Sequence, residues 1–219
     1  YDQQRLARWD DTSADGRYYG EDNWRYVRDA RRLPRLLPVL DGEPSYEHIP
    51  QGLHMEDEPY WTPEQVRRYG WWSVLSGAAG FTYGHNSIKQ FYESGTTGAF
   101  FVKYPWKDAL HAPGCASVSL MGKFMQEIFD ELINRAMADR RCGTHMEGDG
   151  NTQMPAQYVQ GLCGPCESIL SGGSAWKAGD GEARIMAFRA GEYILCYTYT
   201  GAPICLALDA DYSWRAWWM

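Results

Sequence analysis

Apolar residues recur at helical spacing in three stretches of the chain, and each stretch predicts a helix. The three stretches are residues 21–33, 62–77 and 116–138. Pro34 follows the first stretch and ends it, because proline cannot continue a helix. The second stretch begins with Thr62, Pro63 and Gln65, the pattern of an N-cap, a first helical residue and a capping box. The third carries an apolar stripe at spacings of three and four, which indicates packing and no other role.

A short apolar strand is predicted on each side of the second helix. Residues 36–40 form an apolar run that stops at Gly42-Glu43-Pro44, and residues 80–84 form the run after the helix. The order strand, loop, helix, strand, loop is the repeat unit of a parallel α/β structure. In such folds the loops that follow the strands lie on one face, so the sequence predicts a pocket there.

The final third of the chain changes pattern. Residues 139–182 are rich in glycine and have little periodicity, which predicts a linker or a looped insertion. Apolar residues then alternate with period two in four runs, each an expected strand: 184–188, 193–199, 204–208 and 214–218. We therefore divide the chain into an α/β part at 1–138, the linker or insertion at 139–182, and a small all-β domain at 183–219 that is possibly cut short.

The composition narrows the class of partner. The 219 residues carry a net charge of −7, which lacks the positive surface that nucleic acids and anionic membranes require. No apolar run reaches about 18 residues, so no membrane span is predicted. Aromatic residues make up 15% of the chain, with 10 Trp and 15 Tyr. Aromatic faces stack on sugar rings, so a carbohydrate substrate fits; burial in the core is the competing explanation for most of these rings.

Six cysteines leave compartment and redox role open. The run Cys163-Gly164-Pro165-Cys166 reproduces a thioredoxin-like motif, but neither a good strand before it nor a long helix after it is predicted. No second thiol pair accompanies it, so we expect no zinc site. We also expect no other metal and no cofactor. A core of this size does not need disulfides, which favours a reducing, cytoplasmic setting. The amino end neither shows nor excludes an export signal, so localisation stays unknown, with a secreted or periplasmic protein as the alternative to a cytoplasmic one.

The candidate site residues come from the two loops after the strands. Glu43 is the candidate catalytic carboxylate, with a solvated turn acid as the alternative. Glu47, His85 and Asn86 are candidate substrate-binding residues, each with an ordinary loop role as the alternative. Three aromatic residues are candidate walls of the pocket, with burial as the alternative: Tyr46, Tyr83 and Trp61.

Three segments closely resemble the apiosidase-like glycoside hydrolases, family 140: residues 38–50, 77–88 and 106–114. This resemblance implies the C-terminal part of a (β/α)8 TIM barrel followed by a small antiparallel β-sandwich. It implies that Glu43, after the seventh barrel strand, is the nucleophile of a retaining glycosidase. The acid/base carboxylate would follow a fourth strand upstream of Tyr1, so we expect the 219 residues alone to be inactive and the missing N-terminal barrel segment to complete the site. Lys89 stands where the family usually has tryptophan.

Three functions are therefore in competition. The first is a retaining glycoside hydrolase that cleaves a side chain of a plant or microbial polysaccharide. The second is a non-catalytic carbohydrate-binding protein that uses the aromatic pocket and the β domain. The third is a thiol oxidoreductase that uses Cys163 and Cys166, for which the context is poor.

Overall fold

The computed structural model describes residues 23–35, 37–53, 55–142, 163–171, 181–211 and 213–218. Its main elements are α2 (Asn23–Arg31), β1 (Leu40–Asp41), α3 (Pro63–Leu75), β2 (Gly80–Phe81), α4 (Asn86–Lys89), α5 (Pro113–Cys142), β3 (Cys163–Pro165), β4 (Ile185–Ala190) and β5 (Tyr193–Thr198). Short 3-10 helices lie at Asp108–His111, Glu167–Ile169 and Gly181–Ala183. This mixture of helices and strands confirms the α/β class. None of the helices described is long and apolar enough to cross a membrane.

The predicted strand–helix–strand unit is present. β1 and β2 pair in parallel, with Leu40 opposite Gly80 and Asp41 opposite Phe81, and α3 connects them. Of the expected strand at 36–40, residue 36 lies outside the described residues, and only Leu40 belongs to β1. Within the part of the chain described here, the ladder of β1 has only the two residues of β2 as partners. Further along, Glu47 and His85 form an isolated parallel bridge that continues the pairing of the same two segments.

Helix α3 begins as its sequence predicts. Thr62 is the N-cap; its side chain accepts from the Gln65 backbone N–H, and the Gln65 side chain accepts from the Thr62 N–H, so the capping box is complete. The helix ends at Leu75, and Gly77 follows with φ +94°, a conformation that glycine adopts without strain. The helix is buried on the faces that carry Val66, Trp72 and Leu75.

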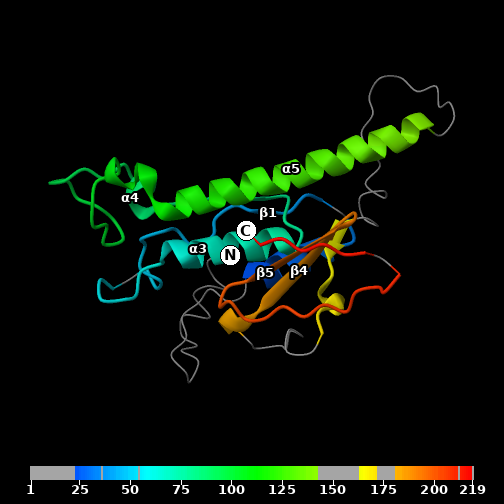
Figure 1. The fold of residues 1–219 in the computed structure, drawn as a ribbon. Helices are drawn as coiled ribbons and strands as arrows, with labels where there is room; N and C mark the ends of the chain where they lie inside the picture. The colour runs from blue at the N-terminus through cyan, green and yellow to red at the C-terminus, as the bar shows by residue number, and fades with distance from the viewer. Residues whose placement is uncertain are drawn as a thin grey trace.

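Helix α5 is longer than expected at both ends. It spans Pro113–Cys142, whereas the apolar stripe predicted 116–138. Figure 1 shows it as a long rod that lies along α3. Residues 139–142, which we assigned to the linker, therefore belong to a helix, and Cys163–Pro165 in the same segment forms strand β3. Residues 143–162 and 172–180 of that segment lie outside the described residues.

The antiparallel sheet has the order β3-β4-β5. The runs at 184–188 and 193–199 are confirmed as the hairpin β4–β5, which turns at Gly191 with φ +60°. The run at 204–208 alternates in burial as predicted but forms no regular strand: Leu206 makes a single bridge to Leu170. Its neighbour is the 3-10 turn Glu167–Ile169, which cannot extend a ladder. The expected strand at 214–218 does not form.

One hydrophobic cluster joins the helices to the sheet. Its buried members come from α2, α3, α5 and β4: Trp24, Trp72, Leu75, Ile128, Met186, Phe188 and Ala190. Two arginines lie over aromatic rings at the same contact. The Arg184 guanidinium lies 3.4 Å from the centre of a Trp24 ring, and that of Arg68 lies 5.0 Å from a Trp72 ring and forms an ion pair with Glu182. The sheet therefore packs directly on the helices.

Candidate functional site

The structure brings together the loops that follow β1 and β2. The Glu47 backbone N–H donates to the carbonyl of Gly84 at 2.9 Å, and the Asn86 N–H donates to the carbonyl of Glu47 at 2.9 Å. These bonds extend the parallel pairing past the strand ends and hold Glu47 beside His85. The carboxyl ends of two parallel strands thus carry acidic and imidazole groups on adjacent segments.

Glu47 is fully buried, with 0% of its surface exposed. Its Oε2 accepts a hydrogen bond from the Tyr83 hydroxyl at 2.7 Å and another from the backbone N–H of Gly114 at 3.0 Å. Gly114 lies in the first turn of α5, where backbone N–H groups favour a negative charge. A Cβ at position 114 would overlap Oε2, so this approach requires glycine. Glu47 therefore fixes the start of α5.

Tyr83 remains a hydrogen-bond donor. Burial raises the pKa of its hydroxyl well above the usual value, and the hydrogen bond to Glu47 and the charge of Glu47 raise it further. The phenol keeps its proton at any physiological pH and continues to donate to the carboxylate.

His85 is a buried, neutral imidazole. It is the N-cap of α4: its Nδ1 accepts from the Ser87 backbone N–H at 3.1 Å, and its Nε2 lies 2.9 Å from the Tyr104 hydroxyl. Burial lowers the pKa of His85 to about 4, and the nearby His48 adds to the effect. A neutral ring whose Nδ1 accepts must carry its proton on Nε2, so His85 donates to Tyr104.

Asn86 makes its hydrogen bonds within the protein. Its amide N–H donates to the carbonyl of Phe100 at 2.8 Å, and its side-chain oxygen accepts from the Gln90 amide at 2.9 Å. Gln90 also bonds the backbone of Ala99 through both ends of its amide. The side chain is fully buried, so Asn86 fastens the segment before Tyr104 to α4. The contact with a sugar that the sequence suggested for it stays a prediction.

Glu43 is in a different environment. It lies two residues after β1, at a bend, and is exposed, whereas the next two residues, Pro44 and Ser45, are buried. The backbone is therefore anchored immediately after an accessible carboxylate. Of the two glutamates that the sequence singled out, Glu43 is the one that is accessible to solvent.

The three candidate aromatic residues are not equivalent. Trp61 is buried in a cluster with Ile49, Val66 and Tyr69, so the packing favours the core role that we kept as the alternative. Tyr83 binds Glu47 as described. Tyr46 is half-buried, and its ring lies 5.2 Å from the Lys89 ammonium, which also lies 3.8 Å from the ring of Phe100. Lys89 is therefore a cation at an aromatic surface.

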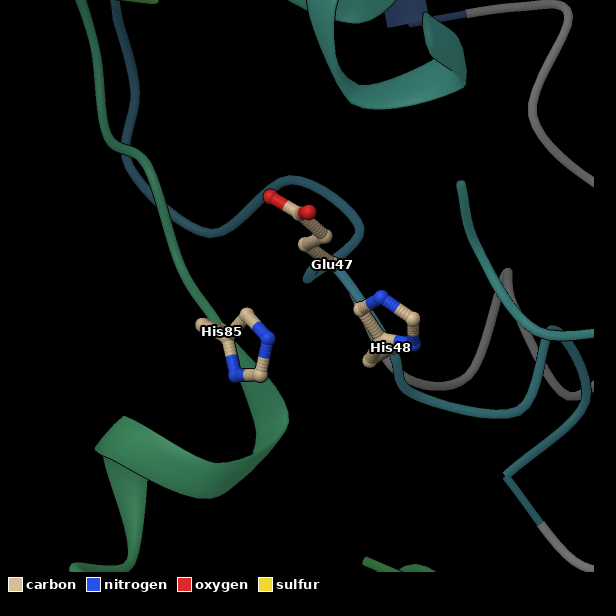
Figure 2. Close-up of side chains that lie close together, drawn as sticks. All are labelled: Glu47, His48 and His85. Carbon is tan, nitrogen blue, oxygen red and sulfur yellow. The ribbon is translucent and has the colours of Figure 1, made fainter. Parts of the chain in front are cut away.

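Three side chains near this point could together hold a metal ion. One ligand atom each from Glu47, His48 and His85 lies within 4.8 Å of the others. Figure 2 shows the two imidazole rings side by side, with the carboxylate of Glu47 above them in this view; the ring planes are tilted by 42°. Both nitrogens of His85 already make hydrogen bonds, one to the Ser87 N–H and one to Tyr104. Binding a metal through His85 would break one of these bonds, so the arrangement fits a hydrogen-bonded network better than a metal centre.

Sequence reasoning missed three residues of this network: His48, Tyr104 and Gly114. Gly114 gave a signal, since a glycine directly after Pro113 at the start of a helix suggests a close backbone approach. His48 adopts φ +57°, which is uncommon for a residue other than glycine and cannot be read from its neighbours in sequence. Tyr104 reaches His85 only through the folding of residues 90–103.

Known proteins resemble this chain in sequence and fold. Residues 9–130, more than half of the chain, match the family described as apiosidase-like, catalytic domain. A crystal structure of a glycoside hydrolase family 5 protein from Bacteroides vulgatus has 33% sequence identity and a TM-score of 0.65, over 85% of this chain and 33% of that chain. A second structure, described as a glycoside hydrolase, has 36% identity and a TM-score of 0.59, over 84% of this chain and 34% of that one. No curated protein matches.

These neighbours place the chain among the glycoside hydrolases in sequence and fold. Within that class, the chain belongs to the apiosidase-like catalytic domain family, as the three segments in its sequence indicated. It spans about a third of the length of the two structures that it matches.

Proposed function

We propose that this chain is part of a retaining glycoside hydrolase that acts on side chains of plant or microbial polysaccharides, with Glu43 as the nucleophile. The observation that carries the proposal is the exposed carboxylate directly after the parallel strand β1, on a backbone that the buried Pro44 and Ser45 hold in place. Family membership and the glycoside hydrolase neighbours support the class of reaction.

Glu47 is the competing carboxylate, and its surroundings favour a supporting role. One of its oxygens is held by two donors, and the side chain is closed off from solvent. A nucleophile has to approach the anomeric carbon of a sugar. Oε2 of Glu47 is held by Tyr83 and by the start of α5, and Oε1, which has no hydrogen-bond partner among the described residues, is buried with the rest of the side chain. Glu43 has no such restriction.

The chemistry requires a second carboxyl group. In a retaining mechanism the nucleophile attacks the anomeric carbon and forms a glycosyl-enzyme, while a carboxylic acid about 5–5.5 Å away protonates the leaving oxygen. The same group then takes a proton from the water that releases the sugar. We propose that this group belongs to further strands of a (β/α)8 barrel that includes β1 and β2, and that the antiparallel sheet is part of a β-sandwich.

Exposed leucines support the barrel. Leu33, Leu37 and Leu40 lie around β1, and Leu40 is 65% exposed although it belongs to a strand. A large apolar residue in a sheet is normally covered. Further barrel strands and helices would cover these side chains, in agreement with the greater length of the related structures.

The test is the Glu43→Gln variant of the gene product that contains this chain, assayed on aryl glycosides. We expect turnover to fall by orders of magnitude with the thermal unfolding midpoint unchanged. In a Glu43→Ala variant, added azide should restore turnover by attacking the sugar in place of the carboxylate.

The matched control is Glu56→Gln, which changes an exposed glutamate in the next loop and should keep full activity. Near-normal turnover in Glu43→Gln would refute the assignment, and sugar binding without turnover in the parent protein would favour a carbohydrate-binding role.

A further inference from the structure

Among the described residues, the hydroxyl of Tyr104 has one hydrogen-bond partner, although a hydroxyl can both accept and donate. It accepts a hydrogen bond from Nε2 of His85, and the direction of that bond is fixed because Nδ1 of His85 is occupied by the Ser87 N–H. The Tyr104 proton must therefore point away from His85. Within the described residues the hydroxyl has no acceptor for this proton at hydrogen-bond distance.

The hydroxyl cannot lose its proton under physiological conditions. Burial raises the pKa of Tyr104 to about 12, and the charges of Glu47 and Asp108 contribute. Tyr104 is therefore a neutral donor with a defined direction, and a donor in this position is most stable when an oxygen acceptor lies in front of it.

The position of Tyr104 is set by the site loops. Its ring lies 5.3 Å from the His48 ring in an edge-on contact and 5.5 Å from the His85 ring. His48 and His85 follow β1 and β2, so Tyr104 lies at the end of the strands that also carries Glu43. Asn86 and Gln90 fasten the preceding loop to α4, which gives the side chain a rigid support.

We propose that Tyr104 is a substrate-binding residue that donates its hydroxyl hydrogen bond to an oxygen atom of the carbohydrate, and that His85 is the positioning residue that directs this bond. The identity of the ligand as a carbohydrate rests on the proposed function. The direction of the His85–Tyr104 hydrogen bond is independent of that function, because it follows from the Ser87 N–H bound at Nδ1.

The first measurement addresses the direction of the bond. Nitrogen-15 spectra of the five histidine side chains at pH 7 should show His85 as the Nε2–H tautomer in the parent protein. The tautomer should persist in Tyr104→Phe, because the Ser87 N–H still occupies Nδ1. A His85 ring protonated on Nδ1 would overturn the proposal.

The second measurement addresses the substrate. Tyr104→Phe should raise KM for aryl glycosides by about three- to tenfold, the loss expected for one neutral hydrogen bond, with a smaller effect on kcat. His85→Asn keeps the α4 cap, because asparagine is also a good N-cap, but removes the donor to Tyr104. It should also raise KM. The KM of the double variant should be no higher than that of Tyr104→Phe, since the two residues act through one chain of hydrogen bonds.

The control is Tyr92→Phe, a half-buried tyrosine in the neighbouring loop whose hydroxyl makes no hydrogen bond to the described residues, and it should leave KM unchanged. Unchanged KM and kcat in Tyr104→Phe would refute the substrate contact. If the parent protein, the gene product that contains this chain, hydrolyses no aryl glycoside, the proposed function fails. The parent protein and Tyr104→Phe are then compared by the dissociation constant of the glycoside, measured by tryptophan fluorescence. An equal constant for the parent and Tyr104→Phe, or the absence of binding, would overturn the proposal.

Discussion

At the level of single residues, two glutamates four positions apart have opposite environments. Glu43 is exposed, and Glu47 is enclosed by Tyr83 and the first turn of α5. The difference arises because the chain bends at Gly42–Ser45 and then pairs again with β2's continuation at His85. Spacing along the sequence alone could not have separated the two roles.

The close approach of α5 to Glu47 gives a prediction at this scale. Gly114→Ala places a methyl group against Oε2 and should destabilise the protein by on the order of 1–3 kcal/mol, through loss of the hydrogen bonds of a buried carboxylate. Gly122→Ala is the matched control, because it lies in the same helix with open space around its Cβ position. It should stabilise by roughly 0.5–1 kcal/mol through helix propensity. Denaturant unfolding measures both, and equal effects would contradict the close-contact interpretation.

At the level of elements, a buried polar cluster connects α2, β1 and α3. The Asp41 carboxylate accepts from the Ser73 hydroxyl and from the Asn23 amide, and Asn23 also donates to the backbone carbonyl of Tyr69 at 2.9 Å. Burial raises the pKa of Asp41, and the two hydrogen bonds only partly offset this effect. The cluster specifies how the three elements meet, at a cost in charge burial.

The raised pKa predicts a pH dependence. Because the folded state holds the Asp41 proton more tightly than the unfolded state, whose pKa is near 3.8, this residue favours folding most at low pH. Its contribution declines as the pH rises from about 3.8 through the folded-state value. The stability difference between the parent protein and Asp41→Asn should therefore shift in favour of Asp41→Asn between pH 4 and 7. Unfolding curves over this range measure the shift, and a constant difference would contradict the raised pKa.

The elements also show which features could be predicted from the sequence. The start of α3 could, because Thr62, Pro63 and Gln65 act on their own helix. The absence of a regular strand at 204–208 could not be predicted from the sequence. A strand requires a neighbour with the right geometry, and here that neighbour is a 3-10 turn. Glu43 and His85 could be selected as site candidates because they follow predicted strands. Tyr104 could not, because only tertiary structure brings it to His85.

At the level of the whole molecule, the helices and the antiparallel sheet share one hydrophobic cluster. Met186 and Phe188 from β4 pack with Trp72 and Leu75 from α3. Two units with separate cores can unfold separately, whereas a common core couples them.

This coupling predicts the behaviour of a core variant. Met186→Ala removes a fully buried side chain and should destabilise by about 2–5 kcal/mol. Because the core is shared, helical circular dichroism and tryptophan fluorescence should show the loss at the same denaturant concentration. Leu120→Ala, which changes an exposed leucine on α5, should shift stability by no more than about 0.5 kcal/mol. Separate transitions for the two probes would show that the cores are independent.

The shared cluster also limits how the protein can be shortened for laboratory work. Ending the polypeptide before Ile185 would remove the residues that cover Trp24, Trp72 and Leu75 and would expose an apolar surface to water. Such a product should precipitate or require a detergent. A useful shortened protein would therefore keep the hairpin of residues 185–198 attached to its helices.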